Sequence, residues 1–380
     1  MIWLPPALLT GISLLLMLWQ WLEGRLFPLH RRVRGRDYAP GLTLLKPLKG
    51  SDAATEACLR SWLTQNYAGP VQVLFAVSSA DDPVCTVVQR LLARHPELEA
   101  RLVVCGERVG PNAKASKLAQ LEPLAQHDLL VISDADVKAP PDLLTNLAAA
   151  FQEQTVGLVN PFYRLGEPTT VAMHCEALAV NSDFWTSVLQ ARRLSPLRFA
   201  LGATMAVRRE TVRQMGGLRV LTDYLADDYE LGRRVAATGA RVMLCPVVVD
   251  CLNAPEGWRH VWKHQLRWAR TIRACQPLAY AASIVSNPTL WPLLLWAVAR
   301  TPLAAQILGV CLLVRFLTAL DNQRRLCQSL VHWKWLWLAP VKDLLQAAWW
   351  GLAFLGNRVE WRGTRFRVTR QGRLETATDQ

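Results

Sequence analysis

The sequence predicts an α/β fold in which a mostly parallel sheet is covered by helices and flanked by transmembrane and interfacial helices. Three observations support this prediction. Short runs of Val, Ile and Leu alternate with stretches of helical periodicity between residues 41 and 253. The chain begins with 21 uncharged residues at positions 2–22. Of the 16 Trp, three precede residue 23 and eleven lie from Trp258 onward, and Trp prefers the water–lipid interface.

The composition excludes several classes of protein. A chain of 380 residues can bury a core without disulfide or metal staples, and 51% hydrophobic with 19% charged residues excludes a disordered protein. The net charge of +13 suits an anionic membrane surface, a phosphorylated ligand or nucleic acid. Nucleic acid is disfavoured because the sequence has no zinc-finger spacing and no RNA-recognition signature. Nine Cys, an odd number with no CxxC pair, indicate a reduced, cytosolic main domain.

Residues 1–23 are predicted to form an N-terminal transmembrane anchor. At about 1.5 Å per residue, the uncharged stretch is long enough to cross a hydrocarbon layer of about 30 Å. A cleaved signal peptide is the alternative, but no basic residue precedes the apolar run, and Trp19, Gln20 and Trp21 make a poor cleavage site. The basic residues that follow place the next segment in the cytoplasm by the positive-inside rule: Arg25, His30, Arg31, Arg32, Arg34 and Arg36.

Residues 40–255 are predicted to form one cytosolic domain. Its strand candidates are short and rich in Val, Ile and Leu: 42–45, 71–77, 102–104, 129–132 and 242–244. Its helix candidates show apolar residues at helical spacing: 52–65, 83–95, 116–126 and 141–154. Such alternation implies a parallel sheet covered on both faces, and ligands of these sheets bind beyond the carboxyl ends of the strands.

The chain changes character after residue 255. Residues 256–275 are basic and aromatic at helical spacing, which predicts an amphipathic helix on the membrane surface. Residues 276–357 form a C-terminal membrane region with three apolar stretches: 279–299, 302–320 and 331–356. The tail, residues 358–380, is basic and is expected in the cytoplasm. An even number of the three stretches should then cross the membrane, so one of them is expected to be interfacial or re-entrant.

The segment 129–137, LLVISDADV, carries the first candidate site. An apolar run ends in Ser133, and Asp134 and Asp136 follow it. Two carboxylates at i and i+2 past a strand can supply oxygen ligands to Mg²⁺ or Mn²⁺, and such a metal neutralises a diphosphate leaving group. An Asp-rich surface turn is the alternative interpretation of this pattern.

A second acidic pair, Asp227 and Asp228, precedes a helical pattern. One of the two carboxylates is a candidate general base that removes a proton from an acceptor hydroxyl. Acidic residues are also favoured at a helix start by the helix dipole, without any further function. Upstream, Gly202 and the pair Gly216 and Gly217 bracket a short strand and helix, which is consistent with a backbone that passes close to a ligand.

Basic and aromatic residues form the remaining candidates. In the HQLRW segment, Arg267 offers a planar cation to phosphate oxygens and Trp268 a flat apolar face. The alternative is the solvated basic face of an amphipathic helix. Four lysines are either phosphate ligands or ordinary surface residues: Lys46, Lys49, Lys114 and Lys117.

Eight short motifs occur in one order along residues 40–370: LKPLKG (45–50), ADDP (80–83), GPNAKASKL (110–118), SDAD (133–136), GATMAVRRET (202–211), ADDY (226–229), HQLRW (264–268) and WRG (361–363). In this order they resemble the ceramide glucosyltransferase family, whose bacterial branches include glycosyltransferases associated with hopanoid lipids. The resemblance implies a GT-A nucleotide-sugar domain. It also implies the inverting transfer of a sugar from UDP to a lipid hydroxyl at the cytosolic face of a membrane, here a bacterial inner membrane.

The resemblance also implies roles for individual residues. Asp134 and Asp136 match the position that binds the nucleotide sugar through a divalent cation, and Asp228 matches the catalytic base. Arg267 and Trp268 match the end of the family's (Q/R)xxRW signature, whose first position falls on His264. The first carboxylate of the family, which would contact the nucleotide, falls on Ser79, with Asp81 and Asp82 close behind. Lys46 and Lys114 complete the set of residues expected to bind the nucleotide sugar.

The sequence therefore predicts a membrane-bound, metal-dependent glycosyltransferase of glycolipid or sphingolipid metabolism. Its donor is UDP-glucose or UDP-N-acetylglucosamine, and its acceptor is ceramide, diacylglycerol or a hopanoid. One alternative is a processive polysaccharide synthase, although few long uninterrupted helices are available to line a polymer channel. Another is a catalytically silent protein that binds a lipid or a partner, since a carboxylate is missing at Ser79.

Overall fold

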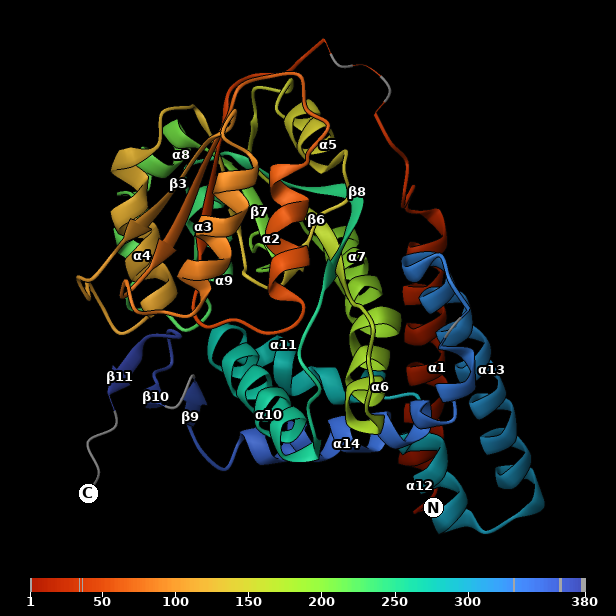
Figure 1. Cartoon of the computed structure of the whole chain (residues 1–380). Coiled ribbons are helices and arrows are strands. Elements are labelled where there is room, and N and C mark those ends of the chain that lie inside the picture. The colour runs from red at the N-terminus through yellow and green to blue at the C-terminus, as the bar shows by residue number, and fades with distance from the viewer. Residues whose placement is uncertain (1, 34, 36, 331, 362–363, 377–380) are drawn as a thin grey trace. The chain divides into compact units, whose positions relative to one another are not determined.

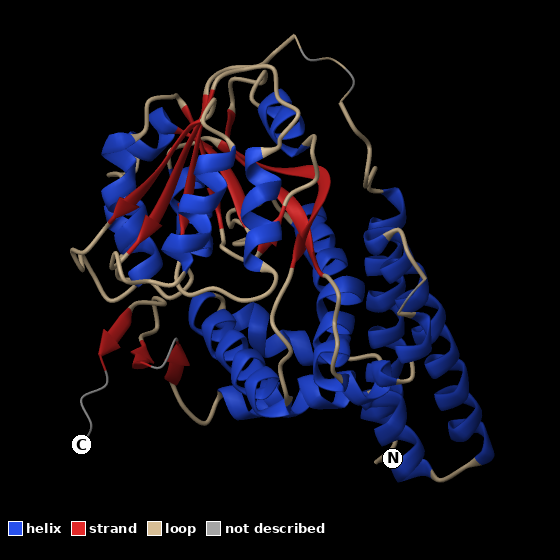
Figure 2. Cartoon of the chain, in the orientation of Figure 1, coloured by secondary structure: helices blue, strands red, loops and turns tan. Residues whose placement is uncertain are grey.

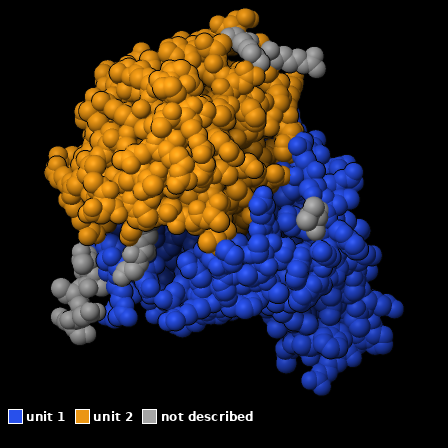
Figure 3. Space-filling view, in the orientation of Figure 1, with its two compact units in different colours: residues 1–28, 167–194, 255–380 blue, residues 29–166, 195–254 orange. Residues whose placement is uncertain are grey.

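The computed structural model describes the chain except residues 1, 34, 36, 331, 362–363 and 377–380. Two residues of the predicted basic segment and two of the WRG motif therefore lie outside the described residues: Arg34 and Arg36, and Arg362 and Gly363. The chain forms two compact units (Figure 3). Unit 2 consists of residues 29–166 and 195–254, and unit 1 of residues 1–28, 167–194 and 255–380.

Unit 2 contains an eight-stranded sheet with the strand order β3-β2-β1-β4-β7-β6-β8-β5 (Figure 1). The strands are β1 (Leu42–Pro47), β2 (Val71–Val77), β3 (Glu99–Val104), β4 (Leu129–Ser133), β5 (Val137–Lys138), β6 (Val156–Leu165), β7 (Thr204–Arg208) and β8 (Arg241–Cys251). Strands β1 to β4 are parallel, as are β6 and β8, whereas β7 and β5 are antiparallel to their neighbours. The predicted α/β fold with a mostly parallel sheet is confirmed.

Helices cover both faces of this sheet (Figure 2). They are α2 (Thr55–Leu63), α3 (Val84–Arg94), α4 (Ala113–Leu121), α5 (Leu143–Ala150), α8 (Arg209–Gln214) and α9 (Asp227–Ala237). Successive strand residues enter two different cores, since Leu44 packs with α2, α3 and α5 while Leu45 packs with α4, α8 and α9. Burial on both faces explains why the strands are continuous apolar runs.

The sheet contains strand segments that were not predicted. Strand β6 and the two-residue strand β5 were not predicted at all, and β8 is eleven residues long where only 242–244 were expected. Strands β6 and β8 pair with each other, but β6 contains Pro161 and the register shifts between Pro161 and Phe162. A proline and a bulge interrupt the apolar pattern that identifies a strand in the sequence.

Unit 1 is mainly helical. Its helices are α1 (Leu4–Leu26), α6 (Val171–Leu178), α7 (Trp185–Leu194), α10 (Trp258–Cys275), α11 (Pro277–Ala282), α12 (Leu290–Ala299), α13 (Pro302–Cys327) and α14 (Leu338–Ala353). A π-helical turn, η2 (Ala179–Phe184), joins α6 directly to α7. The tail forms a three-stranded sheet of β9 (Arg358–Trp361), β10 (Thr364–Val368) and β11 (Leu374–Thr376). The segment from α6 to α7 belongs to this unit, although the sequence places it between the strands of unit 2.

Two described helices, α1 and α13, are long and apolar enough to cross a membrane, and the bent pair of Pro277–Ser286 and Leu290–Ala299 would make a third crossing if it is one span. Helix α14, which covers most of the third predicted stretch, has 16 residues and is not among them. The ends of α1 and α13 lie together, because Asp321 accepts hydrogen bonds from Trp21 Nε1 at 2.8 Å and Arg25 Nη1 at 3.1 Å. The two helices therefore run in the same direction.

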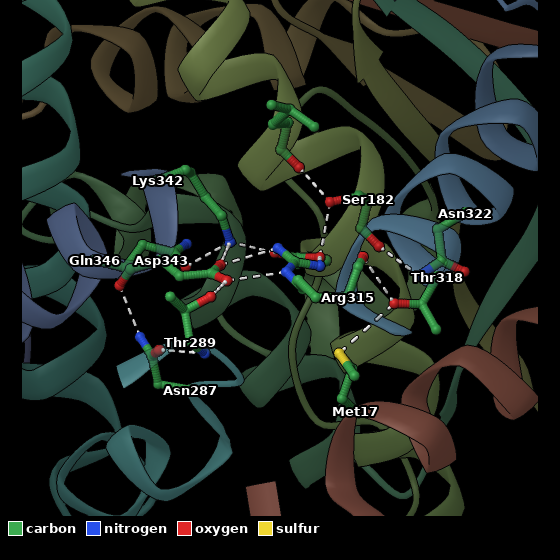
Figure 4. Close-up of polar contacts among 12 residues, drawn as sticks. Met17, Ser182, Asn287, Thr289, Arg315, Thr318, Asn322, Lys342, Asp343 and Gln346 are labelled. Atoms are coloured by element: carbon green, nitrogen blue, oxygen red, sulfur yellow. Dashed lines mark hydrogen bonds and ion pairs between the residues drawn. The ribbon is translucent and has the colours of Figure 1, made fainter. Parts of the chain in front are cut away.

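Four charged residues form a buried cluster inside unit 1 (Figure 4). Arg315, in the middle of α13 and 2% exposed, donates two hydrogen bonds to Asp183 and two to Asp343, at 2.7 to 2.9 Å. Lys342 forms ion pairs with the same two carboxylates, and Thr289 Oγ1 donates to Asp343 at 2.6 Å. Two positive and two negative charges make the cluster neutral, which reduces the cost of placing it in an apolar helix bundle.

This charge balance leads to a stability prediction. Lys342→Met leaves two buried carboxylates opposite one cation, so we expect a loss of about 3 to 5 kcal/mol in the free energy of unfolding, measured in detergent micelles. The double variant Lys342→Met, Asp183→Asn restores neutrality and should recover most of that loss. Arg324→Met, at an exposed position of α13, the helix that carries Arg315, serves as the control. The explanation would be contradicted if the double variant lost as much unfolding free energy as the Lys342→Met single variant, or more.

Candidate active site

The two acidic motifs of unit 2 lie near the carboxyl end of β4. Ser133 is the last residue of that strand and pairs with Thr204 of the antiparallel strand β7. The turn that follows is held by the Asp134 N–H, which donates to the Ala203 carbonyl at 3.1 Å. This end of the sheet is where α/β proteins bind their ligands.

Lys114 connects the two motifs. Its Nζ lies 2.7 Å from Asp134 Oδ1 and 3.1 Å from Asp227 Oδ2, and the residue is 9% exposed. Burial alone would lower the pKa of Lys114, but Asp134 and Asp227 hold it well above its ordinary value. The lysine is therefore a permanent cation between two carboxylates that are 93 positions apart in the sequence.

The helix start of α4 places Lys114. Asn112 is the N-cap, and its side-chain oxygen accepts hydrogen bonds from the N–H groups of Lys114 and Ala115 at 2.9 and 3.0 Å. The side-chain nitrogen of the same Asn112 donates to the Tyr224 carbonyl at 2.8 Å. One buried asparagine thus connects the lysine's helix to the segment before α9, the helix that begins at Asp227.

Asp227 and Asp228 are adjacent but differ in their surroundings. Asp227 is buried against Lys114, whereas Asp228 is partly exposed and accepts a hydrogen bond from the Tyr229 N–H at 2.8 Å. Burial, and then the charge of Asp227, raises the pKa of Asp228 to about 6. A Cβ at Gly202 would lie 2.5 Å from Asp228 Oδ2, so the carboxylate fits only because that residue is a glycine.

Asp134 and Asp136 fit a divalent cation that is shared with a ligand. Burial, and then the charge of Asp134, raises the pKa of Asp136 to about 6, and a cation would relieve this repulsion. No group of three or more His, Cys, Asp and Glu in the described part of the chain could hold a metal by itself. Mg²⁺ is usually bound through one or two carboxylates together with substrate phosphates, so a pair is sufficient.

Lys46, at the end of β1, is fully buried and contacts the turn that carries Asp134. Its Nζ donates to Ser133 Oγ at 3.1 Å and to the Asp134 carbonyl, and it lies 4.9 Å from the centre of the Trp62 ring. Burial lowers the pKa of Lys46 to about 8. Its expected contact with a nucleotide stays a prediction, and the contacts present are to the turn at Ser133 and Asp134.

The residues expected to contact the nucleotide follow β2. Ser79 and Asp81 are exposed, and Ser79 Oγ lies 3.3 Å from Asp81 Oδ2. Asp82 instead accepts hydrogen bonds from the N–H groups of Gly50 and Val84, at 2.9 and 3.1 Å. Of the three candidates, Asp82 therefore stabilises the local backbone by hydrogen bonds, while the side chains of Ser79 and Asp81 are exposed to solvent.

The HQLRW residues lie on α10 in unit 1. His264, Arg267 and Trp268 are partly buried, and the spacing i, i+3, i+4 places them on one face of the helix. The His264 ring lies 4.7 Å from the Trp268 ring, and His264 Nδ1 lies 2.6 Å from Glu176 Oε1. Glu176 was not among the predicted site residues. The signal that could have found it is a single acid in the otherwise apolar stretch of α6.

Curated relatives are ceramide glucosyltransferases. The chain is 26% identical over 219 residues to ceramide glucosyltransferase 3 of Caenorhabditis elegans, which covers 56% of this chain and 46% of that protein. It is 29% identical over 156 residues to the ceramide glucosyltransferase of Candida albicans, which covers 37% and 28%. The chain thus spans about half the length, or less, of the curated relatives it matches. The resemblance seen in the motifs is confirmed.

A solved structure and a family model extend the match over the chain. The mannosyltransferase PcManGT from Pyrobaculum calidifontis, in complex with GDP-Man and Mn²⁺, has a TM-score of 0.53 and 22% identity, and the match covers 90% of this chain and 98% of that one. This likeness confirms the GT-A type of fold. The family model of glycosyl transferase family 21 matches residues 6–374, and the chain belongs to this family.

Proposed function

We propose that this protein transfers a hexose from a UDP-sugar to the hydroxyl group of a membrane lipid, with inversion at the anomeric carbon. The observation that carries the proposal is that Lys114 forms ion pairs with Asp134 and with Asp227, the neighbour of Asp228, in a chain of glycosyl transferase family 21. Helices that can cross a membrane support a lipid acceptor. The ceramide glucosyltransferase relatives favour glucose as the sugar and ceramide as the acceptor.

Asp228 is the proposed general base. A carboxyl group with a pKa near 6 is ionised at pH 7 and is more basic than an ordinary aspartate. In the proposed step Asp228 accepts the proton of the lipid hydroxyl, and the hydroxyl oxygen forms a bond to the anomeric carbon. The bond from that carbon to the diphosphate oxygen breaks on the opposite face, so the configuration is inverted.

Asp134 and Asp136 are the residues proposed to hold Mg²⁺ or Mn²⁺. When bound, the cation would neutralise charge on the departing diphosphate. Lys114 orients Asp134 and offsets the negative charge of the acidic cluster through its ion pairs with Asp134 and Asp227. Arg267 is proposed to bind diphosphate oxygens and Trp268 to contact the lipid, as the signature of the family implies.

The proposed orientation places unit 2 in the cytoplasm. Arg25 at the end of α1 and Arg324 and Arg325 at the end of α13 lie on the same side, because these helix ends are in contact. By the positive-inside rule that side is cytoplasmic. With α1, the bent pair and α13 as crossings, the chain begins outside and continues inside, and α14 is the stretch that does not cross.

The base assignment predicts a kinetic difference between Asp228 and Asp223, two aspartates of the same segment. Asp228→Asn should lower kcat by about 10²- to 10⁴-fold, because general-base catalysis contributes that much. Donor affinity should stay nearly unchanged, since the base acts on the acceptor. Asp223→Asn, an exposed acid of the same segment, is the matched control and should keep full turnover. UDP release with a lipid extract measures turnover, and near-normal turnover in Asp228→Asn would refute the assignment.

The metal assignment predicts that Asp136→Ala abolishes transfer in a folded protein and that Asp134→Ala nearly does so. In both variants the diphosphate charge would no longer be neutralised, so added Mn²⁺ should not restore UDP release. Asp128→Ala changes an exposed acid at the other end of β4 and should respond to chelator and Mn²⁺ like the unmodified protein. Full turnover of the Asp134, Asp136 double variant in chelator would show that this site is misassigned.

The orientation predicts which surface residues are accessible from outside the cell. Eight of the nine native cysteines are buried and Cys275 is partly buried, so a thiol reagent has a low background. Cysteine introduced at the exposed Glu107 should be labelled only after the membrane is opened, whereas cysteine at the exposed Arg300, between α12 and α13, should be labelled in sealed cells. The reverse pattern would overturn the topology and the cytosolic source of the donor.

A further inference from the structure

We infer that Glu176 is the positioning residue for the HQLRW face of α10, so that its carboxylate sets the orientation of His264 and of the residues one turn further along. The inference rests on the proposed function for its catalytic consequence. Glu176 lies on α6 and precedes His264 by 88 positions. None of the eight sequence motifs described above includes it.

One oxygen of Glu176 binds two residues of the motif. Oε1 lies 2.6 Å from His264 Nδ1 and 2.7 Å from Gln265 Nε2. The Glu176 side chain is 3% exposed, and Gln265 is one of the two buried residues of α10. A buried carboxylate is costly unless its hydrogen bonds are satisfied, so the two motif residues and the glutamate depend on one another.

This pairing fixes the histidine ring. With Nδ1 bound to a carboxylate, Nδ1 carries a proton and Nε2 is the second hydrogen-bonding atom of the ring. The ring then packs against Trp268 at 4.7 Å, and Trp268 lies 6.4 Å from Phe184 of the π-helical turn. A chain of contacts therefore leads from Glu176 through His264 to Trp268, the residue next to Arg267.

Glu176 is not needed merely to hold the two helices together. The first turn of α6 is already tied to the residue range before α10, since Thr170 Oγ1 donates to the Glu256 carbonyl at 2.5 Å and the Glu256 N–H lies 3.3 Å from Met173 Sδ. The other buried residues of α6 are mainly apolar, and a leucine at position 176 would be buried at a lower cost than a carboxylate. The acid is therefore explained by its two side-chain partners rather than by packing.

The test compares Glu176→Gln and Glu176→Leu with Glu256→Gln. The amide of Gln keeps an oxygen that accepts hydrogen bonds but loses the charge, and Leu removes both interactions. We expect kcat for UDP release to fall by up to about 100-fold in Glu176→Leu and by less in Glu176→Gln, because a small misplacement of a reacting group can cost that much. The donor KM should change less than kcat, since the negative charge on the diphosphate oxygens that Arg267 is proposed to bind is greatest in the transition state.

The control and a second measurement separate positioning from folding. Glu256 precedes α10, and its carboxylate lies 3.3 Å from His260, which is on α10. The variant Glu256→Gln should keep both kcat and KM. Hydrogen exchange of the peptide over residues 260–268 should be faster in both Glu176 variants and unchanged in Glu256→Gln, at equal thermal stability. If Glu176→Leu does not fold, Glu176→Gln alone decides the question.

The outcomes distinguish this inference from the proposed function. Unchanged kcat in an active enzyme, or a loss of activity that only follows the folded fraction, would overturn the positioning role. If the unmodified protein releases no UDP with any donor, the proposed function fails, and hydrogen exchange then decides whether Glu176 holds α10. Faster exchange in the Glu176 variants would support the claim that Glu176 restrains α10, and unchanged exchange would overturn it.

Discussion

The ion pairs of Lys114 with Asp134 and Asp227 are the interaction on which the candidate site depends. Carboxylates close together repel one another, and a buried cation between them offsets this repulsion. The cation comes from the first turn of a helix whose cap also binds the loop of Asp227. The same few contacts thus determine the geometry of both acidic motifs and their charge.

Unit 1 also contains buried charges of opposite sign that balance one another, here in an apolar environment. Arg315 lies in the middle of a helix that could cross a membrane, and its charge is balanced by Asp183 and Asp343. Asp183 belongs to the continuous helix of α6, η2 and α7, which also carries Glu176. That helix therefore binds the C-terminal helices through one acid and the HQLRW helix through another. Asp183 lies within the π-helical turn η2, which is consistent with a functional segment, since such turns are frequent at functional sites.

Several features could be predicted because they are local. Short continuous apolar runs identified the first four strands, apolar residues at helical spacing identified the helices between them, and the uncharged stretch at positions 2–22 identified the N-terminal helix. Asp134, Asp136 and Asp228 were singled out as candidates because carboxylates that follow an apolar run or begin a helix stand out in a sequence. The segment 167–194 was missed as part of the helical unit, and β6 was missed because Pro161 and a bulge break its pattern.

By itself the sequence determined the fold class, the family and the candidate residues, since these depend on the order and spacing of residue types. Tertiary structure alone decided which of them meet. It paired Lys114 with Asp134 and Asp227, buried Lys46 against the turn of Asp134 and joined Glu176 to His264 across 88 positions. Such contacts depend on how helices pack in three dimensions, and no period or spacing along the chain encodes the choice of a partner so far away.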